Sequence, residues 1–128
     1  MKLLLFFIFI FFPVLKTIAQ NPAPTTGIAS YYHAKFEGRK TASGEIFCND
    51  SLTAAHKTLP FGTFVLVTHL KNQNQVQVRI NDRLPLKSKR SIDLSKKAAK
   101  ALNMIQSGLA KVQIEVLEEP VIETESGN

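Results

Sequence analysis

The stretch VRINDRLP, residues 78–85, is the most informative part of the sequence. Val78 and Ile80 alternate with polar residues, which is typical of a β-strand with one buried face. The same alternation places Asp82 on the apolar face of Val78 and Ile80, directly before a turn. Burial of an unpaired carboxylate is costly, so an acid on the core-facing side of a strand needs a chemical reason.

Patterns of period two recur on both sides of this stretch. A mostly apolar run at 64–69 suits a strand buried on both faces, and the turn residues KNQN at 71–74 join it to the next strand as a hairpin. Five or six strands with little helix predict an all-β domain closed as a small barrel. The predicted strands are 27–33, 64–69, 75–81, 111–117 and a short segment near Ile92.

Helical structure is predicted in two places. Ser95 can cap a helix that ends before Gly108, with lysines on its solvated side. In SLTAAHKTLP, residues 51–60, we expect at most a single helical turn, which Pro60 ends. The apolar side of the longer helix is formed by Leu94, Ala98, Ala101, Leu102 and Ile105.

The two ends of the chain differ from this domain. Lys2, an apolar run of about 13 residues and the small residues Thr17 and Ala19 match a signal peptide cut after Ala19. The run is shorter than the roughly 20 residues that a spanning helix needs. Because no cysteine follows it, we expect an exported protein of the periplasm or cell envelope, neither lipid-anchored nor membrane-anchored after cleavage. The expected organisation is signal peptide 1–19, linker 20–26, domain 27–117 and acidic, disordered tail 118–128.

Charge is concentrated in the domain. Residues 20–117 hold 14 basic and 6 acidic side chains, a formal charge of +8. Nucleic acid is an improbable partner for an exported protein, so the charge favours anionic wall polymers or membrane surfaces, or serves solubility alone. The single cysteine, Cys48, cannot form an internal disulfide and is interpreted as a small apolar filler.

Few residues could carry chemistry. The histidines at 33, 56 and 69 lack metal-like spacing, and no CxxC, HxxxH or glycine-rich phosphate loop is present, so no metal site is expected. A nucleophile pair of Cys48 and His56 lacks an activating loop. The stronger signal is acid catalysis by Glu45 and Asp82.

Asp82 admits two interpretations. A carboxyl group at the mouth of a barrel, backed by apolar side chains, loses hydration and holds its proton more tightly, as a general acid must. Alternatively, Asp82 caps the following turn or pairs with Arg83, and then it is a structural carboxylate.

Four motifs in order resemble the RlpA (rare lipoprotein A) family of septal peptidoglycan lytic transglycosylases. They are GRKTASGE at 38–45, LTAAHKTLP at 52–60, NDR at 81–83 and IDLS at 92–95, within a match that spans about 27–117. Each motif alone is weak evidence, but their combination is very specific. The resemblance implies a six-stranded double-psi β-barrel with one short α-helix.

The resemblance also implies an activity. The family cuts the β-1,4 bond between N-acetylmuramic acid and N-acetylglucosamine and leaves a 1,6-anhydro sugar. Its polar site positions fall on Glu45, His56 and Asp82, with Asp82 matching the catalytic acid. Hydrolytic glycosidases pair two carboxylates, whereas here the 6-hydroxyl of the sugar attacks, so one protein acid can suffice. Either Glu45 or His56 could position the sugar or share the proton transfer.

Further contacts to the substrate are expected from the same motifs. No cofactor or metal is implied, and the expected partner is the glycan strand of peptidoglycan, bound by a monomer. The residues expected to bind the substrate are Tyr32, Arg39, Lys40, Thr41, Lys57, Asn81 and Arg83.

The chain departs from the family pattern at several positions. Leu84 follows NDR where the family usually has glycine, and YYH at 31–33 replaces WYG. With no tryptophan, a stacking platform must come from Tyr31, Tyr32 or Phe36, unless these rings only pack the core. The family's lipobox cysteine and SPOR domain have no counterpart, which argues against septal targeting. The alternatives are a non-catalytic, expansin-like wall-binding module and a secreted interaction protein that acts through its basic face.

Overall fold

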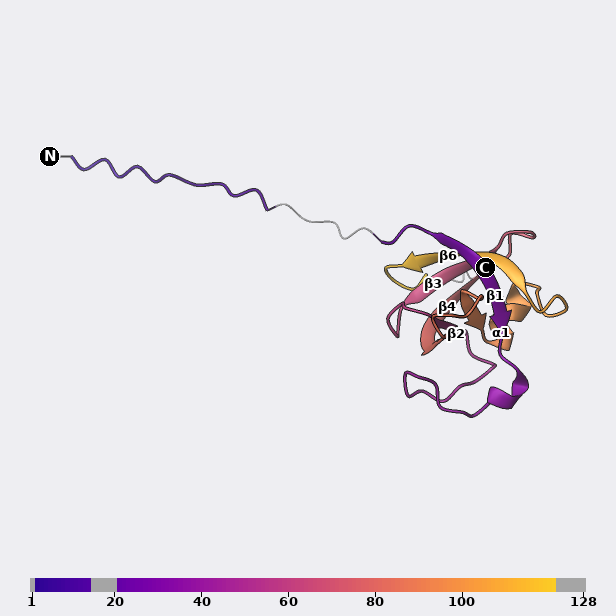
Figure 1. Cartoon of the computed structure of the whole chain (residues 1–128). Helices are drawn as coiled ribbons and strands as arrows, with labels where there is room; N and C mark the ends of the chain where they lie inside the picture. The colour runs from indigo at the N-terminus through magenta and orange to yellow at the C-terminus, as the bar shows by residue number, and fades with distance from the viewer. Residues whose placement is uncertain (1, 15–20, 122–128) are drawn as a thin grey trace, which may run out of the picture.

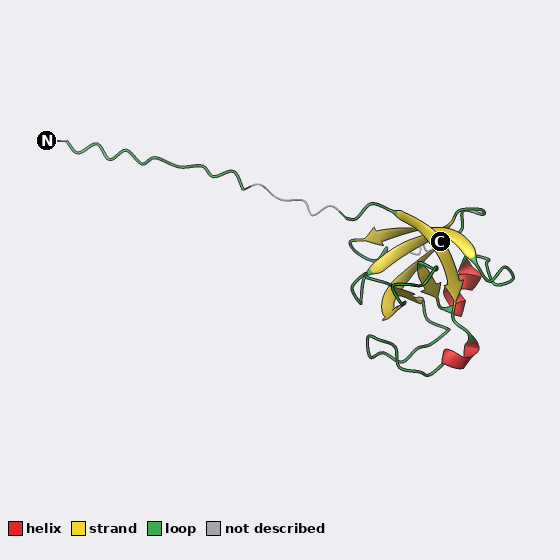
Figure 2. Cartoon of the chain, viewed as in Figure 1, coloured by secondary structure: helices red, strands yellow, loops and turns green. Residues whose placement is uncertain are grey.

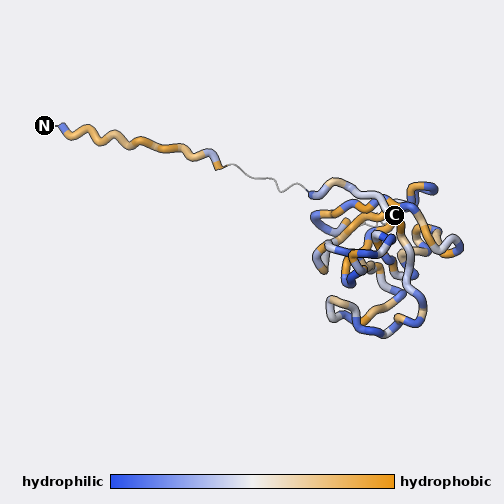
Figure 3. The backbone as a smooth tube through the Cα atoms, viewed as in Figure 1, coloured by the Kyte–Doolittle hydropathy of each residue, from blue (hydrophilic) through white to orange (hydrophobic). Residues whose placement is uncertain are grey.

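The computed structural model describes residues 2–14 and 21–121. Residues 2–14 contain no helix or strand, and their large apolar side chains are exposed. Figure 3 shows this segment as a hydrophobic (orange) run. No helix in these two ranges is long and apolar enough to cross a membrane. The predicted cut after Ala19 and the acidic tail beyond Val121 lie outside the described residues.

Six strands close into a barrel, in the order β1-β5-β2-β4-β3-β6 (Figure 1). β1 pairs with β5, and β2 with β4, in parallel, and the remaining neighbours are antiparallel. Closure leaves no exposed sheet edge, and it confirms the predicted all-β, six-stranded barrel. The strands are β1 (Thr25–Tyr31), β2 (Thr53–His56), β3 (Phe64–His69), β4 (Gln75–Arg83), β5 (Ile92–Leu94) and β6 (Ala110–Leu117).

The core confirms the predicted alternation of β4 and β6, whereas β3, which was predicted to be buried on both faces, buries only one of them. Every second residue is buried in β3, in β4 as far as Ile80 and in β6 as far as Ile114, because successive side chains of a strand point to opposite faces. Burial of these branched side chains supplies the main stabilisation of a chain whose one cysteine is unpaired. The buried residues of this set include Val65, Val67, Val76, Val78, Ile80, Val112 and Ile114.

The first strand and the second differ from the prediction. β1 begins at Thr25, which pairs with Ile114, so two residues assigned to the linker belong to the barrel. The predicted helical turn within 51–60 is wrong, because Thr53–His56 forms β2 between β4 and β5. Ala54 and Ala55 are small enough to be buried between β4 and β5, which pair with β2 on either side. This tertiary packing overrides the helix propensity of alanine.

Helix is confined to η1 (Ala34–Phe36), a 3₁₀ turn, and α1 (Lys96–Ala101) in the described residues (Figure 2). The predicted cap is confirmed, since the Ser95 hydroxyl accepts a hydrogen bond from the N–H of Ala98 at 3.3 Å. The helix is shorter than predicted. Asn103 adopts a left-handed conformation (φ 55°), which ends the helix before Ile105.

Candidate active site

β4 changes register with β2 just before it ends. Ala54 pairs with Ile80, but Ala55 pairs with Asp82, so Asn81 is an extra residue in a bulge. Neighbouring alanines face opposite ways, and therefore so do their partners Ile80 and Asp82. The prediction that Asp82 shares the face of Val78 and Ile80 is wrong. Instead Asn81 is buried and Asp82 is half-buried on the other face.

Asp82 is held by three hydrogen-bond donors. Its Oδ1 accepts from the backbone N–H of Ala42 and of Arg83, each at 2.9 Å. Its Oδ2 accepts from the hydroxyl of Tyr32 at 2.5 Å. Among the described residues no ion pair joins Asp82 to the guanidinium of Arg83, so of the two structural roles only the backbone cap is present. Oδ1 is thus anchored by two backbone donors, whereas Oδ2 has only the Tyr32 hydroxyl as a partner among the described residues.

Tyr32 is fixed by aromatic packing. Its ring centroid lies 4.3 Å from that of Phe47 and 5.6 Å from that of Phe36, in an edge-on arrangement. Burial raises the pKa of Tyr32, and the hydrogen bond and negative charge of Asp82 raise it further, so the hydroxyl remains a donor. The ring is therefore part of the site's support rather than a free stacking platform. The Tyr31 hydroxyl donates to the carbonyl of Ile105 at 2.8 Å, so Tyr31 serves the core.

The GRKTASGE motif forms a loop over the end of β4. The N–H and hydroxyl of Thr41 both donate to the carbonyl of Glu45, at 2.8 and 2.9 Å, and Gly44 takes the left-handed conformation that the turn needs. The N–H of Ser43 donates to the carbonyl of Asn81 at 3.2 Å. Thr41 is buried, so the structure gives it a role within the loop, not the predicted one at the surface.

Glu45 is exposed and fully paired. Arg79 donates to both of its oxygens, at 2.6 and 2.9 Å, and the Asn81 side chain donates to Oε2 at 3.2 Å. These hydrogen bonds lower the pKa of Glu45, so its carboxylate stays ionised at neutral pH. The loop thus places Glu45 beside the residue that precedes Asp82. The sequence did not predict that Arg79 belongs to the site, because it occupies one of the polar positions of an alternating strand.

His56 ends β2 directly opposite Arg83. Its Nδ1 accepts from the N–H groups of Thr58 and Leu59, each at 3.1 Å. A backbone N–H can only donate, so Nδ1 carries no proton and the neutral ring carries it on Nε2. Burial lowers the pKa of His56, and the charges of Arg83 and Lys57 lower it further. His56 therefore presents a neutral N–H donor.

The remaining predicted cations are arranged differently. The ammonium group of Lys57 donates to the carbonyl of Ser88 at 2.6 Å and is half-buried. Arg39 is exposed, with its guanidinium 5.4 Å from the ring centroid of Phe36. Lys40 is also exposed, at the bridge that the loop makes with Ile46. Of these three, Arg39 and Lys40 are free to meet a ligand.

Arg83 stacks on an aromatic ring that sequence analysis did not select. Its guanidinium lies 4.1 Å from the ring centroid of Phe61, which is 43% exposed. The turn that carries Phe61 is tied to β4, because the N–H of Gly62 donates to the carbonyl of Ile80 at 2.8 Å. The signal in the sequence was the PFG triplet at 60–62 just after TAAHKTL, an apolar residue between two turn formers.

A second acid shares the row of Asp82. In the strand register Asp82 is opposite Ala55, Ala55 is opposite Asp93, and Asp93 is opposite Ser30. Arg90 donates to both oxygens of Asp93, at 2.8 and 3.1 Å, and the Ser30 hydroxyl also donates to it. Asp93 is thus satisfied by neighbours of its own.

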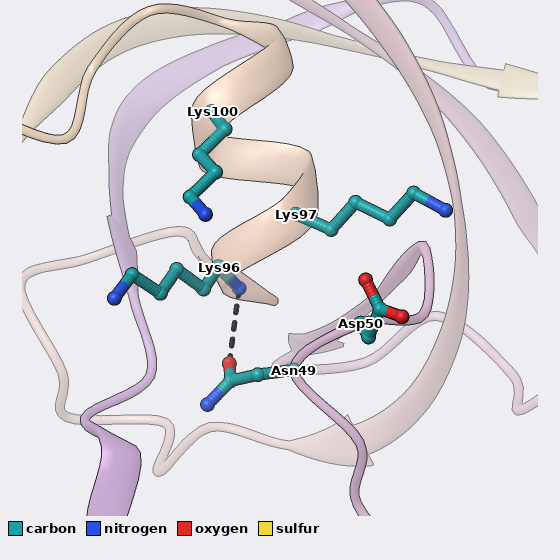
Figure 4. A pocket seen from close by; sticks show the side chains of 5 residues that line it. All are labelled: Asn49, Asp50, Lys96, Lys97 and Lys100. Carbon is teal, nitrogen blue, oxygen red and sulfur yellow. Dashed lines mark hydrogen bonds between the residues drawn. The ribbon is translucent and has the colours of Figure 1, made fainter.

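Two hollows of the described surface lie away from Asp82, Glu45 and His56. One, of about 210 Å³, is lined by the lysine side of α1 and a loop that caps this helix through Asn49 (Figure 4). The other, of about 660 Å³, follows β3 and β4 to Val121. Within residues 2–14 and 21–121 no group of three or more His, Cys, Asp or Glu could hold a metal. The candidate active site is therefore centred on the carboxyl group of Asp82, away from these two hollows.

A closed six-stranded barrel with this crossed strand order defines a double-psi β-barrel domain. The family model described as "Lytic transglycolase" matches residues 24–114, and the chain belongs to this family. The resemblance seen in the motifs is thereby confirmed.

Curated relatives support this family assignment, and a solved structure supports the fold. The chain is 56% identical over 91 residues to the endolytic peptidoglycan transglycosylase RlpA of Haemophilus influenzae, covering 71% of this chain and 32% of the relative. It is 47% identical over 107 residues to the protein of that name from Campylobacter jejuni, covering 84% and 38%. The chain thus spans about a third of these relatives. An expansin of Clavibacter michiganensis, solved with cellohexaose, has the same fold (TM-score 0.61, 22% identity, 78% of this chain and 53% of that chain).

Proposed function

We propose that this chain is an endolytic peptidoglycan transglycosylase. It cuts the β-1,4 bond between N-acetylmuramic acid and N-acetylglucosamine and leaves a 1,6-anhydro end. Family membership and two relatives of that name support the proposal. The observation that carries it is the hydrogen bonding of Asp82, whose Oδ1 is anchored by two backbone donors while Oδ2 has a single hydroxyl partner.

Asp82 is the proposed proton donor. It protonates the glycosidic oxygen as the bond from that oxygen to the anomeric carbon breaks. The 6-hydroxyl of the muramic acid forms a new bond to the same carbon, and its proton passes to the carboxylate that Asp82 has become. The acid is then restored, and no water is consumed. Because the attacking group belongs to the sugar, a second protein carboxylate is not required.

Glu45 and His56 are assigned supporting roles. Glu45 is ionised and paired with Arg79, so it suits stabilisation of positive charge on the sugar ring and acceptance of hydroxyl protons in hydrogen bonds. His56 is neutral with Nδ1 occupied, so it suits donation from Nε2 to a sugar oxygen. Neither group is poised as the general acid at neutral pH.

Sugar contacts are proposed at the exposed aromatic and basic side chains around Asp82. Phe61 presents an accessible ring beside Arg83, and a pyranose can stack on such a surface through its C–H face. Arg39 and Lys40 on the loop are exposed and can meet acetamido or carboxylate oxygens.

Export is part of this proposal. A wall enzyme must reach peptidoglycan, and the predicted signal peptide at 1–19 would deliver a monomer to the periplasm or cell envelope. The proposed partner is the glycan strand, and no role with nucleic acid is assigned to the basic surface.

Digestion of purified sacculi tests the function. The chain from Gln20 onward should release anhydro-muramyl products that mass spectrometry identifies by the loss of one water relative to hydrolytic products. Sacculi that bind the protein but release no such products would contradict the enzyme and favour the expansin-like binder. Failure both to bind and to cleave would favour an interaction protein.

A further inference from the structure

The two oxygens of Asp82 have different surroundings. Oδ1 accepts two backbone N–H bonds of 2.9 Å, from Ala42 on the loop and from Arg83 on its own strand. A backbone N–H cannot accept a hydrogen bond, so a proton on Oδ1 would displace at least one of these donors. Any proton on Asp82 therefore belongs on Oδ2.

Oδ2 faces the hydroxyl of Tyr32, a group that can reverse its role. A hydroxyl has one proton and two lone pairs, and it rotates freely about its C–O bond. It donates to Oδ2 when Asp82 is ionised and accepts from Oδ2 when Asp82 is protonated. The same position thus serves Asp82 in both of its charge states, over a distance of 2.5 Å.

The Tyr32 ring cannot easily move away. The rings of Phe47, which is 3% exposed, and of Phe36 both pack against the ring of Tyr32. Its backbone N–H donates to the carbonyl of Leu94 at 3.0 Å, which ties the end of β1 to β5. The hydroxyl is therefore held by packing that does not involve Asp82.

From this geometry we infer that Tyr32 is a positioning residue for Asp82. It fixes Oδ2 as the oxygen that carries the catalytic proton. This inference rests on the proposed function where it concerns catalysis, whereas the contact between the Tyr32 hydroxyl and the Asp82 carboxyl group can be tested without activity.

The charged groups near Tyr32 and Asp82 come from several elements of the barrel. Asp93 from β5 acts on Tyr32 through its charge, Arg83 follows Asp82 in β4, and Lys35 and Arg39 lie over the neighbouring Phe36 ring. Glu45 and Arg79 neutralise each other beside Asn81. With these groups unchanged, loss of the Tyr32 hydroxyl removes the hydrogen-bond partner that the structure gives Oδ2.

The experiment compares Tyr32→Phe with Tyr31→Phe in the chain from Gln20 onward. Both changes delete one hydroxyl, but that of Tyr31 donates to the Ile105 carbonyl instead of Asp82. Tyr32→Phe keeps the packed ring, and thermal melting checks that each variant folds. Carboxyl ¹³C NMR records the resonance of Asp82, and kcat and KM are measured for release of anhydro products from sacculi.

In Tyr32→Phe the ¹³C resonance of the Asp82 carboxyl group should shift, because Oδ2 loses its hydroxyl partner. The kcat for product release should fall by about 3- to 10-fold with little change in KM. Tyr31→Phe should leave the resonance and kcat unchanged. An unshifted Asp82 resonance in Tyr32→Phe would overturn the inference, as would equal changes in both variants. If the wild type releases no anhydro products, the proposed function fails, and the NMR comparison alone still decides the role of Tyr32.

Discussion

The guanidinium of Arg79 forms a bidentate, fork-like ion pair with the carboxylate of Glu45, in which one nitrogen donates to each oxygen, at 2.6 and 2.9 Å. The side chain of Arg79 is 34% exposed and that of Glu45 is 44% exposed. Surface ion pairs of this kind add less than about 1 kcal/mol to stability. The fork matters more for geometry. It holds the loop at 38–45 across the bulge that carries Asp82.

Replacing Arg79 by glutamine should therefore impair activity more than stability. We expect release of anhydro products to fall about 10-fold, which corresponds to about 1.4 kcal/mol, with little change in melting temperature. Lys111→Gln is a matched control, because it removes one exposed positive charge from β6, away from the loop. Equal losses in the two variants would mean that net charge, rather than the fork, is responsible.

The same ion pair predicts a pH dependence of stability. Arg79 lowers the pKa of Glu45 in the folded protein, so the stabilisation is complete above the unfolded value of about 4.3 and is lost as pH falls through the lower folded value. The melting-temperature difference between wild type and Arg79→Gln should thus shrink between about pH 7 and about pH 3. A difference that grows on acidification would contradict this sign.

Asp82→Asn tests the acid directly. The amide retains the shape of the side chain and can still accept the N–H groups of Ala42 and Arg83, but it has no proton to give. Product release should fall by roughly 10²–10⁴, while binding to sacculi is retained. Undiminished release would move the acid elsewhere, with Glu45 the next residue to test.

His56→Ala should give a smaller loss of activity, of about 10-fold, because one neutral donor is removed. Its pKa is lowered in the folded protein, so the neutral ring favours folding above the unfolded value of about 6.5, and this benefit is lost as pH falls through the folded value. The melting temperature of wild type should therefore approach that of His56→Ala between about pH 8 and about pH 5. An unchanged gap would show that the ring titrates no differently when folded.

Phe61→Ala tests the proposed sugar platform. Loss of the ring should weaken binding to glycan by about 10-fold, the scale of one aromatic contact, and should affect KM more than kcat. Leu109→Ala is the control, since Leu109 is 55% exposed on a loop before β6. Binding that weakens equally in both variants would indicate a general loss of apolar surface.

Sequence patterns predicted those parts of the fold where one strand face is buried and the other is not. β3, β4 and β6 alternate cleanly, so their positions followed from period two alone. The position of β2 was not predicted, because Thr53, Ala54 and Ala55 are all buried between two neighbouring strands and show no apolar–polar alternation. Its alanines then resembled a helical turn.

The candidate site was predicted by motif and not by geometry. The loop and β2 bring Glu45 and His56 to the end of β4 that carries Asp82. That these three residues form a catalytic site stays a prediction. The bulge at Asn81 could not be foreseen, since an extra residue in a strand leaves no periodic signal. Nor could the partners Arg79 and Phe61, which depend on how a loop and a turn meet β4.

The crossed order of the strands also governs when the site comes into being. Tyr32 follows β1 and Asp82 ends β4, and β1 is held in the barrel only by β5 and β6. Such long-range pairing folds slowly, on the order of milliseconds to seconds. A nascent chain that has emerged only as far as β4 can contain every residue of the NDR motif without its tyrosine in place. The contact between Tyr32 and Asp82 therefore needs the strands β5 and β6 that follow β4 in the chain, so the proposed acid is complete only when the whole domain has folded.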